Sequence, residues 1–135
     1  MTTGDPLAAD LGAAVTDLAR VLIREGVHVN RTSLSVLATL RDGPRRITDL
    51  AGCEFISQPG MTALVSRLED EGWVERRPDP TDGRAVNVVI TKKGLATLDA
   101  ALAARTEALR KRIDRLGPDD HEAVAQAVET IRKLV

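Results

Sequence analysis

The sequence is poor in aromatic side chains, since its 135 residues contain one Phe, one Trp and no Tyr. A hydrophobic core must therefore be built mainly from Leu, Val and Ala. Ala and Leu are strong helix formers, so this composition favours a mostly helical fold. The length predicts one domain covering residues 1–135.

Other absences restrict the class of protein. The single Cys53 cannot form an internal disulfide, the first residues lack the apolar segment of a signal peptide, and no apolar run approaches the roughly 18 residues of a membrane span. We therefore expect a cytoplasmic protein with no membrane partner. The sequence also lacks a phosphate-binding glycine loop and a nucleophile elbow, so we expect neither an enzyme nor a cofactor.

The sequence predicts neither a metal site nor a redox-active cysteine. His28 and His121 are the only histidines, and neither has a partner at ligand spacing, so no metal site is predicted. Cys53 ends a short predicted helix, and we expect it to be a buried structural residue. The net charge is −1, so any positive surface for nucleic acid must be local.

Apolar residues spaced three and four apart predict long helices at both ends of the sequence. One spans residues 7–24, another spans 92–116, and a last one begins at Pro118. Between the first two, Asn30 is a favourable N-cap for a helix that continues to Arg41. The long helices carry more apolar surface than one small core requires.

The centre of the sequence has a different pattern. A short helix is predicted over residues 48–53, followed by a longer one that Ser57 caps, that reaches Glu71 and that Gly72 ends. Residues 73–77 and 85–90 are the strand candidates, and the turn-rich segment between them predicts a hairpin. The expected fold is mostly α with a small β-hairpin, in which residues 48–90 form a helix-turn-helix followed by a wing.

Three segments resemble the MarR family of bacterial transcriptional regulators. They are ISQPGMT at residues 56–62, SRLEDEGWVERRPDPTDGRA at 66–85, and ITKKG at 90–94. The resemblance implies a winged helix-turn-helix lobe over about residues 28–94, with dimerisation helices at 7–25 and 95–135. It further implies a repressor that binds a palindromic double-stranded DNA operator as a homodimer and is released by a small-molecule effector.

The charge pattern of the longer central helix agrees with that resemblance. Residues 57–67 contain no acid, whereas acids cluster at the other end, as suits a helix that enters the major groove by its N-terminal half. Gln58 is the best candidate for reading a base edge. The expected DNA-binding residues are Ser57, Gln58, Pro59, Gly60, Thr62, Ser66, Arg67, Arg76, Arg77, Asp82 and Arg84.

The wing contributes the remaining contacts. By resemblance, Arg84 would reach the minor groove and Asp82 would be its carboxylate partner. An arginine at a hairpin tip suits the narrow, electronegative minor groove of A·T-rich DNA. Arg76 and Arg77 would contact phosphate or brace the wing.

The terminal helices are expected to form the dimer, as they do in the resembled family. A monomer that folds all of its apolar stripes onto the wing domain is the alternative. The expected interface residues are Leu7, Leu11, Val15, Leu18, Leu109, Ile113, Leu116, Val124, Val128 and Ile131.

The effector is not specified by the sequence. Trp73, Phe55, and Arg24 or Arg41 are the only candidates for a pocket of the family's type, so the pocket would be aliphatic or no ligand would exist. Two other functions stay open: a winged-helix protein adaptor without DNA binding, and a regulator that responds to metal or oxidant.

Overall fold

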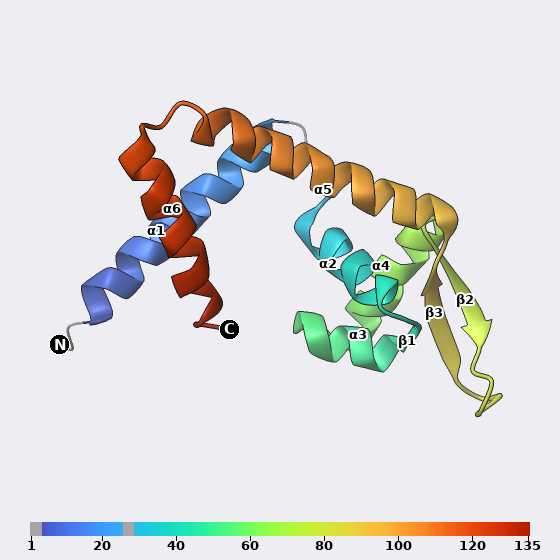
Figure 1. Ribbon diagram of the computed structural model, residues 1–135. Helices are drawn as coiled ribbons and strands as arrows, with labels where there is room; N and C mark the ends of the chain where they lie inside the picture. Colours follow the sequence, from blue (N-terminus) through green and yellow to red (C-terminus); the bar gives the residue numbers. More distant parts are fainter. Residues whose placement is uncertain (1–3, 26–28) are drawn as a thin grey trace. The chain divides into compact units, whose positions relative to one another are not determined.

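The structure is a computed structural model that describes residues 4–25 and 29–135. His28 lies outside these ranges. The helices and strands, labelled in Figure 1, are α1 (Gly4–Arg24), α2 (Arg31–Arg41), β1 (Arg45–Arg46), α3 (Ile47–Glu54), α4 (Gln58–Asp70), β2 (Val74–Pro78), β3 (Val86–Ile90), α5 (Lys92–Ile113) and α6 (Pro118–Arg132). None of the helices in the described ranges is long and apolar enough to cross a membrane.

The chain divides into two compact units. The terminal unit combines Met1–Gly26 with Ala104–Val135, and the central unit is the continuous segment Val27–Ala103. Helix α5 contributes residues to both units.

The predicted caps of the central helices are confirmed. The Asn30 side chain accepts a hydrogen bond from the backbone N–H of Ser33 at 2.8 Å, and Ser57 accepts one from Gly60 at 3.1 Å. Gly72 follows α4 with φ of 80°, a conformation that glycine adopts without the steric cost of a Cβ atom. Helices α2 and α4 therefore begin and end within a residue or two of their predicted limits.

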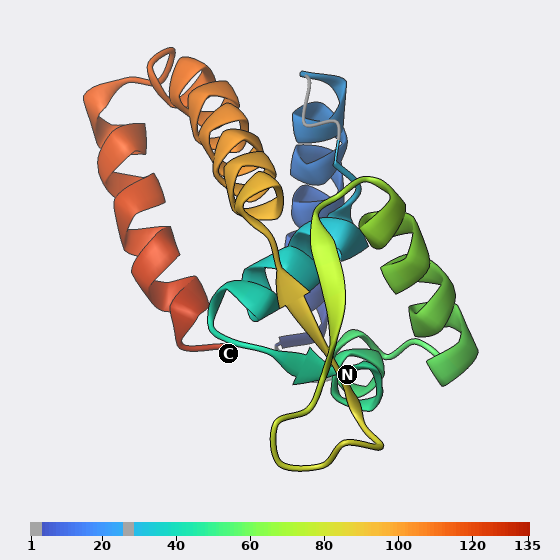
Figure 2. The same ribbon diagram turned by 90° about the vertical axis from the view of Figure 1, so that its right-hand side faces the viewer.

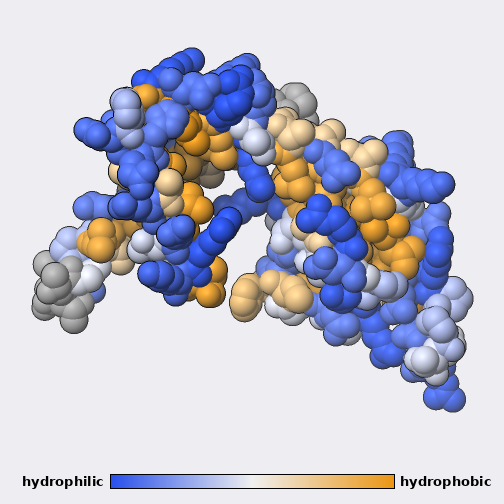
Figure 3. Space-filling view, viewed as in Figure 1, coloured by the Kyte–Doolittle hydropathy of each residue, from blue (hydrophilic) through white to orange (hydrophobic). Residues whose placement is uncertain are grey.

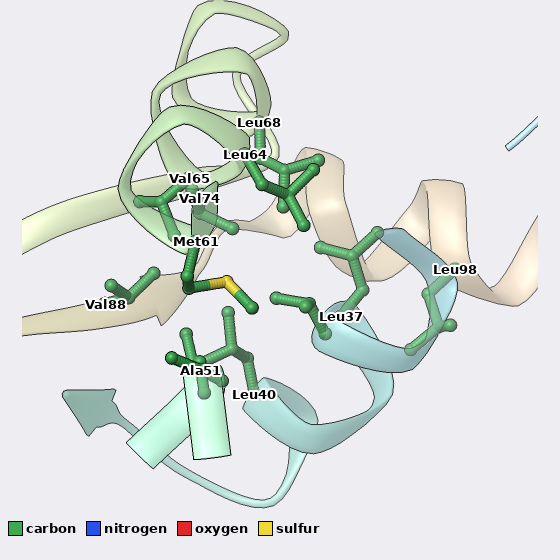
Figure 4. Close-up of a cluster of buried hydrophobic side chains, with 12 residues drawn as sticks. Leu37, Leu40, Ala51, Met61, Leu64, Val65, Leu68, Val74, Val88 and Leu98 are labelled. Carbon is green, nitrogen blue, oxygen red and sulfur yellow. The ribbon is translucent and has the colours of Figure 1, made fainter. Parts of the chain in front are cut away.

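The core of the central unit is aliphatic, as the composition requires. Met61 of α4 lies at its middle in Figure 4, among side chains from the other elements. The cluster consists of Val36, Leu37, Leu40, Leu50, Ala51, Met61, Leu64, Val65, Leu68, Val74, Val88 and Leu98. Every helix and long strand of the unit contributes to it, so the cluster fixes α4 and the hairpin on one scaffold.

The predicted hairpin is confirmed as β2 and β3, each displaced by one residue at its start. A third strand, β1, was not predicted, and it pairs with β3 to give an antiparallel sheet of order β1-β3-β2. Arg45 is opposite Val88 and Arg46 is opposite Asn87. A strand of two residues is too short to show an alternating pattern, which is why the sequence does not reveal it.

The first half of α5 serves the central unit. Leu98 is completely buried in that unit's core, and Leu102 packs against it, although both lie in the segment 95–135 that was assigned to dimerisation. Helix α5 ends at Ile113, three residues before the predicted limit, because the chain turns before the N-cap of α6 at Gly117.

In the terminal unit, α1 begins at Gly4, three residues before the predicted start. The end of α1 is tied to α5 by an ion pair between Glu25 and Arg112. Neither α1 nor α6 contains a buried residue in the parts that the structure describes. These two helices therefore carry apolar side chains that the chain itself does not cover.

Candidate nucleic-acid interface

The N-terminal turn of α4 presents polar groups and no carboxylate. Ser57 caps it, Pro59 lies in the first turn, and the turn contains no acidic residue. Gln58 and Thr62 are exposed, and the Thr62 hydroxyl donates to the Gln58 carbonyl at 3.0 Å. No hydrogen bond of the Gln58 side-chain amide occurs within the described residues, so the amide is available to an external partner.

The far end of α4 is joined to the wing by Arg76. Its guanidinium contacts Glu69 at 2.6 Å and donates to the Ser66 hydroxyl at 2.9 Å, while its backbone N–H donates to Glu69 at 3.3 Å. Ser66 also donates to the Thr62 carbonyl. Ser66 and Arg76 therefore brace β2 against α4, which is one of the two roles expected for Arg76.

The wing turn between β2 and β3 extends beyond the helices of the central unit (Figure 2). Arg84 is exposed there. The Asp82 carboxylate accepts a hydrogen bond from the backbone N–H of Arg84 at 3.1 Å. The hydrogen bond between these two residues therefore involves the Arg84 backbone and not its guanidinium. Arg77 pairs with Glu75 at 2.9 Å on the exposed side of β2.

A second aspartate holds the base of the wing turn. Asp79 accepts from the backbone N–H of Thr81 at 2.9 Å, from the Thr81 hydroxyl at 2.8 Å and from Arg46 at 3.0 Å. The two Thr81 bonds, followed by the Arg46 guanidinium, hold the pKa of the Asp79 carboxyl at about 2, below its ordinary value of 3.8. Sequence reasoning missed this contact because Arg46 lies in the unpredicted strand β1.

A hollow of about 290 Å³ lies where α3, α4 and the wing meet. Its lining residues are Arg46, Ile47, Thr48, Gln58, Ala85 and Val86. Because residues of both segments line this hollow, the start of α4 and the base of the wing lie beside one another.

The expected DNA-binding arginines fall into two groups. Arg76 and Arg77 each have a carboxylate partner, whereas no carboxylate within the described ranges pairs with Arg67 or Arg84. An unpaired guanidinium gives up no existing ion pair when it binds a phosphate. Arg67 and Arg84 are therefore the stronger candidates for electrostatic contact with DNA.

The expectation of a buried Cys53 is wrong, because this residue is exposed on α3. The short helix has only one buried face, formed by Leu50 and Ala51, and Cys53 is not on it. The neighbouring Phe55 is 98% exposed, which places it away from any pocket of this chain. Among the described residues, no group of three or more His, Cys, Asp or Glu side chains could hold a metal ion.

The terminal unit presents apolar side chains at the residues expected to form an interface. Leu7, Val15 and Leu18 of α1 are exposed, as are Val128 and Ile131 of α6. Figure 3 shows apolar side chains among the hydrophilic ones along these two helices. Leu116 is also exposed, and the remaining members of the expected set, Leu11, Leu109, Ile113 and Val124, are half-buried.

The central unit is a helix-turn-helix, α3 and α4, followed by a two-stranded wing, and this arrangement defines the winged helix-turn-helix class of DNA-binding proteins. Residues 29–85 match the model of the MarR family. An uncharacterized HTH-type transcriptional regulator of Mycobacterium leprae is 36% identical over 132 residues, which cover 96% of this chain and 92% of the relative. The chain belongs to the MarR family of HTH-type transcriptional regulators.

Solved structures show the same fold. The RV1404 protein of Mycobacterium tuberculosis superposes with a TM-score of 0.83 at 18% identity, covering 99% of this chain and 95% of that one. Apo MarR from E. coli gives a TM-score of 0.75 at 21% identity, covering 93% and 96%. The family consists of DNA-binding regulators of transcription and not of enzymes.

Proposed function

We propose that this protein is a repressor that binds a palindromic operator as a homodimer. Helix α4 would enter the major groove by its N-terminal turn, and the wing would place Arg84 in the adjacent minor groove. The observation that carries the proposal is the acid-free first turn of α4, with the free Gln58 amide beside the base of the wing. A dimer that covers its operator represses by occupying the DNA, which requires no activity beyond binding.

Dimerisation is supported by the large apolar side chains of α1 and α6 that the single chain leaves exposed, because such side chains gathered on a surface are a common mark of an interface. A two-fold axis would present two copies of α4 to successive major grooves on one side of the duplex. The half-site centres would then lie about 10 base pairs apart.

Release by a small ligand is supported by a second hollow, of about 230 Å³, in the central unit. It is lined by Val29, Asn30, Ser33, Leu64, Arg67, Leu68, Glu71 and Trp73. An anionic ligand held there by Arg67 would occupy the single cationic side chain of α4. Its binding would therefore weaken the contact of α4 with phosphate.

The test is a selection of duplexes from a randomised pool, followed by affinity measurements on single variants. Gln58→Ala should cost about 1–3 kcal/mol of binding free energy and relax the preference at one position per half-site. Arg84→Ala should weaken binding according to the A·T content of the flanks and leave the central consensus unchanged. Gln126→Ala, the same chemical change on α6, serves as the control and should bind as the wild type.

The outcomes separate the competing functions. If the wild type selects no duplex, the adaptor function without DNA binding is favoured. If Gln58→Ala leaves the selected motif intact while Arg84→Ala rewrites its core, the assignment of α4 and the wing is wrong.

A further inference from the structure

The wing turn contains two aspartates whose carboxylates both bind inside the turn. Asp79 accepts from the backbone N–H of Thr81, and Asp82 accepts from the backbone N–H of Arg84, each two residues further on. This is the geometry by which aspartate side chains stabilise turns. Two such turns in succession connect the end of β2 to Arg84.

The ends of this turn are closed by backbone hydrogen bonds. The Asp79 N–H donates to the Ala85 carbonyl at 2.9 Å, and the Ala85 N–H donates to the Asp82 carbonyl at 3.0 Å. Pro78 and Pro80 stand on either side of Asp79, and each fixes its own φ. These hydrogen bonds and the two prolines restrict the backbone conformation of the turn that carries Arg84.

Asp79 is also the point at which the turn is attached to the rest of the sheet. Its side chain is only 10% exposed, and Arg46 of β1 donates to it across 33 positions of sequence. Strand β1 pairs with β3, so Arg46 holds the turn from the strand beside the hairpin. An ion pair between exposed groups usually contributes little, but here it adds to two hydrogen bonds on one carboxylate.

We infer that Asp79 and Arg46 are positioning residues for DNA reading: together they hold the wing turn in the conformation that presents the Arg84 guanidinium to the minor groove. This inference rests on the proposed DNA-binding function. The inference gives Arg46 a role in holding the wing and not in binding DNA directly. Its guanidinium already binds Asp79, so a DNA phosphate would have to compete with that carboxylate. The inference also explains how a wing that approaches DNA can carry the Asp79 carboxylate, because the Arg46 guanidinium balances its charge.

The test is a double-mutant cycle on DNA affinity. The probe is the duplex that the wild-type chain selects from a randomised pool, measured at one salt concentration with Asp79→Ala, Arg46→Met, Arg84→Ala and the two double variants that contain Arg84→Ala. A residue that acts through Arg84 has no effect once Arg84 is absent. We expect Asp79→Ala to weaken binding by about tenfold in the wild-type background, which is ~1.4 kcal/mol, and to have no further effect in the Arg84→Ala background.

Two controls separate positioning from general loss of structure or charge. Arg41→Met removes an arginine from another ion pair of the central unit, with Asp99, and should bind DNA as the wild type. Amide hydrogen exchange of the free protein should show faster exchange at Thr81 and Arg84 in the Asp79→Ala variant, with the core of the central unit unchanged.

The possible results are distinguishable. If the effects of Asp79→Ala and Arg84→Ala are additive, or if exchange at Thr81 and Arg84 is unaltered, the inference is overturned. If Arg46→Met still weakens binding in the Arg84→Ala background, Arg46 contacts phosphate directly and is not a positioning residue. If the wild type binds no duplex, the proposed function itself fails.

Discussion

Phe55 combines an unfavourable backbone conformation with complete exposure. Among the described residues other than glycine, only Phe55 has a positive φ, 54°, at the end of α3. A residue with a Cβ atom in this region costs roughly 1–2 kcal/mol. Because the ring is exposed and gains nothing by burial, Phe55→Gly should raise the free energy of unfolding by about 1 kcal/mol, as measured by urea denaturation.

Phe55→Ala is the matched control, because it removes the ring but keeps the Cβ atom. Its stability should stay close to that of the wild type. If alanine stabilised the protein as much as glycine does, the exposed ring and not the backbone would be the source of the cost.

At the scale of elements, the start of α5 packs against the connection between α4 and β2. The Thr91 hydroxyl accepts from the Gly94 N–H at 3.0 Å and donates to the Gly72 carbonyl at 2.6 Å. A Cβ atom on Gly94 would lie 2.1 Å from the Trp73 carbonyl oxygen, so the backbone would have to move. We expect Gly94→Ala to lower the free energy of unfolding by about 1–3 kcal/mol or more in urea titrations.

The same substitution at Gly52 serves as a control, because it should change the free energy of unfolding in the opposite direction. A Cβ atom there meets nothing within 4 Å, and the residue lies inside α3. Gly52→Ala should therefore stabilise the protein by up to about 1 kcal/mol, since alanine is the better helix former. Equal losses in both variants would refute the packing argument for Gly94.

The wing turn should show a defined pH dependence. The folded pKa of Asp79, about 2, lies below the ordinary value of 3.8, so the folded state favours its charged form. The resulting stabilisation is present above pH 3.8 and is lost as the pH falls through about 2. The stability difference between the wild type and Asp79→Asn should be constant at neutral pH and shrink below pH 3.8; a difference that grew with acidification would contradict the assignment.

The sequence predicts the elements that local patterns define. Asn30 and Ser57 are recognisable caps, and apolar periodicity identifies the long helices α1 and α5 with an error of a few residues at the ends. Features that depend on partners distant in sequence are not predictable in this way. Strand β1 exists because Arg45 and Arg46 pair with β3, and the Asp79–Arg46 contact follows from that pairing.

The sequence alone does not tell which candidate DNA-binding arginines are already bound to other side chains of the protein. Arg76 and Arg84 are both wing arginines, but the structure shows that Arg76 is bound to Glu69 and Ser66 while the Arg84 side chain has no carboxylate partner within the described ranges. Burial is equally hard to predict in a short helix. Cys53 looked buried by its residue type, yet α3 buries only the face that carries Leu50 and Ala51.

For the whole molecule, the apolar residues of the terminal unit lead to a prediction of oligomeric state. Val128→Asp should convert a dimer to a monomer at micromolar concentration, because a carboxylate buried in an apolar interface is costly. Val128 is 44% exposed in the single chain, so the substitution should leave the central unit folded. Light scattering measures the mass, and circular dichroism checks the helical content.

Gln126→Asp introduces the same carboxylate on α6, two residues before Val128 and on a different face of the helix. This control should stay dimeric. A monomeric wild type, or dimers from both variants, would exclude α6 from the interface.

The division of the chain into units also sets an order of events during synthesis. The central unit is one continuous segment, so all of its parts have been translated by the time residue 103 is added. The terminal unit combines residues on both sides of that segment, and α1 must wait for residues 104–135 before its own unit is whole. Since domains generally fold as units while the chain is being made, the central unit with its helix-turn-helix can form first. Helix α1 must wait, for the time taken to translate the central unit, before its own unit can form.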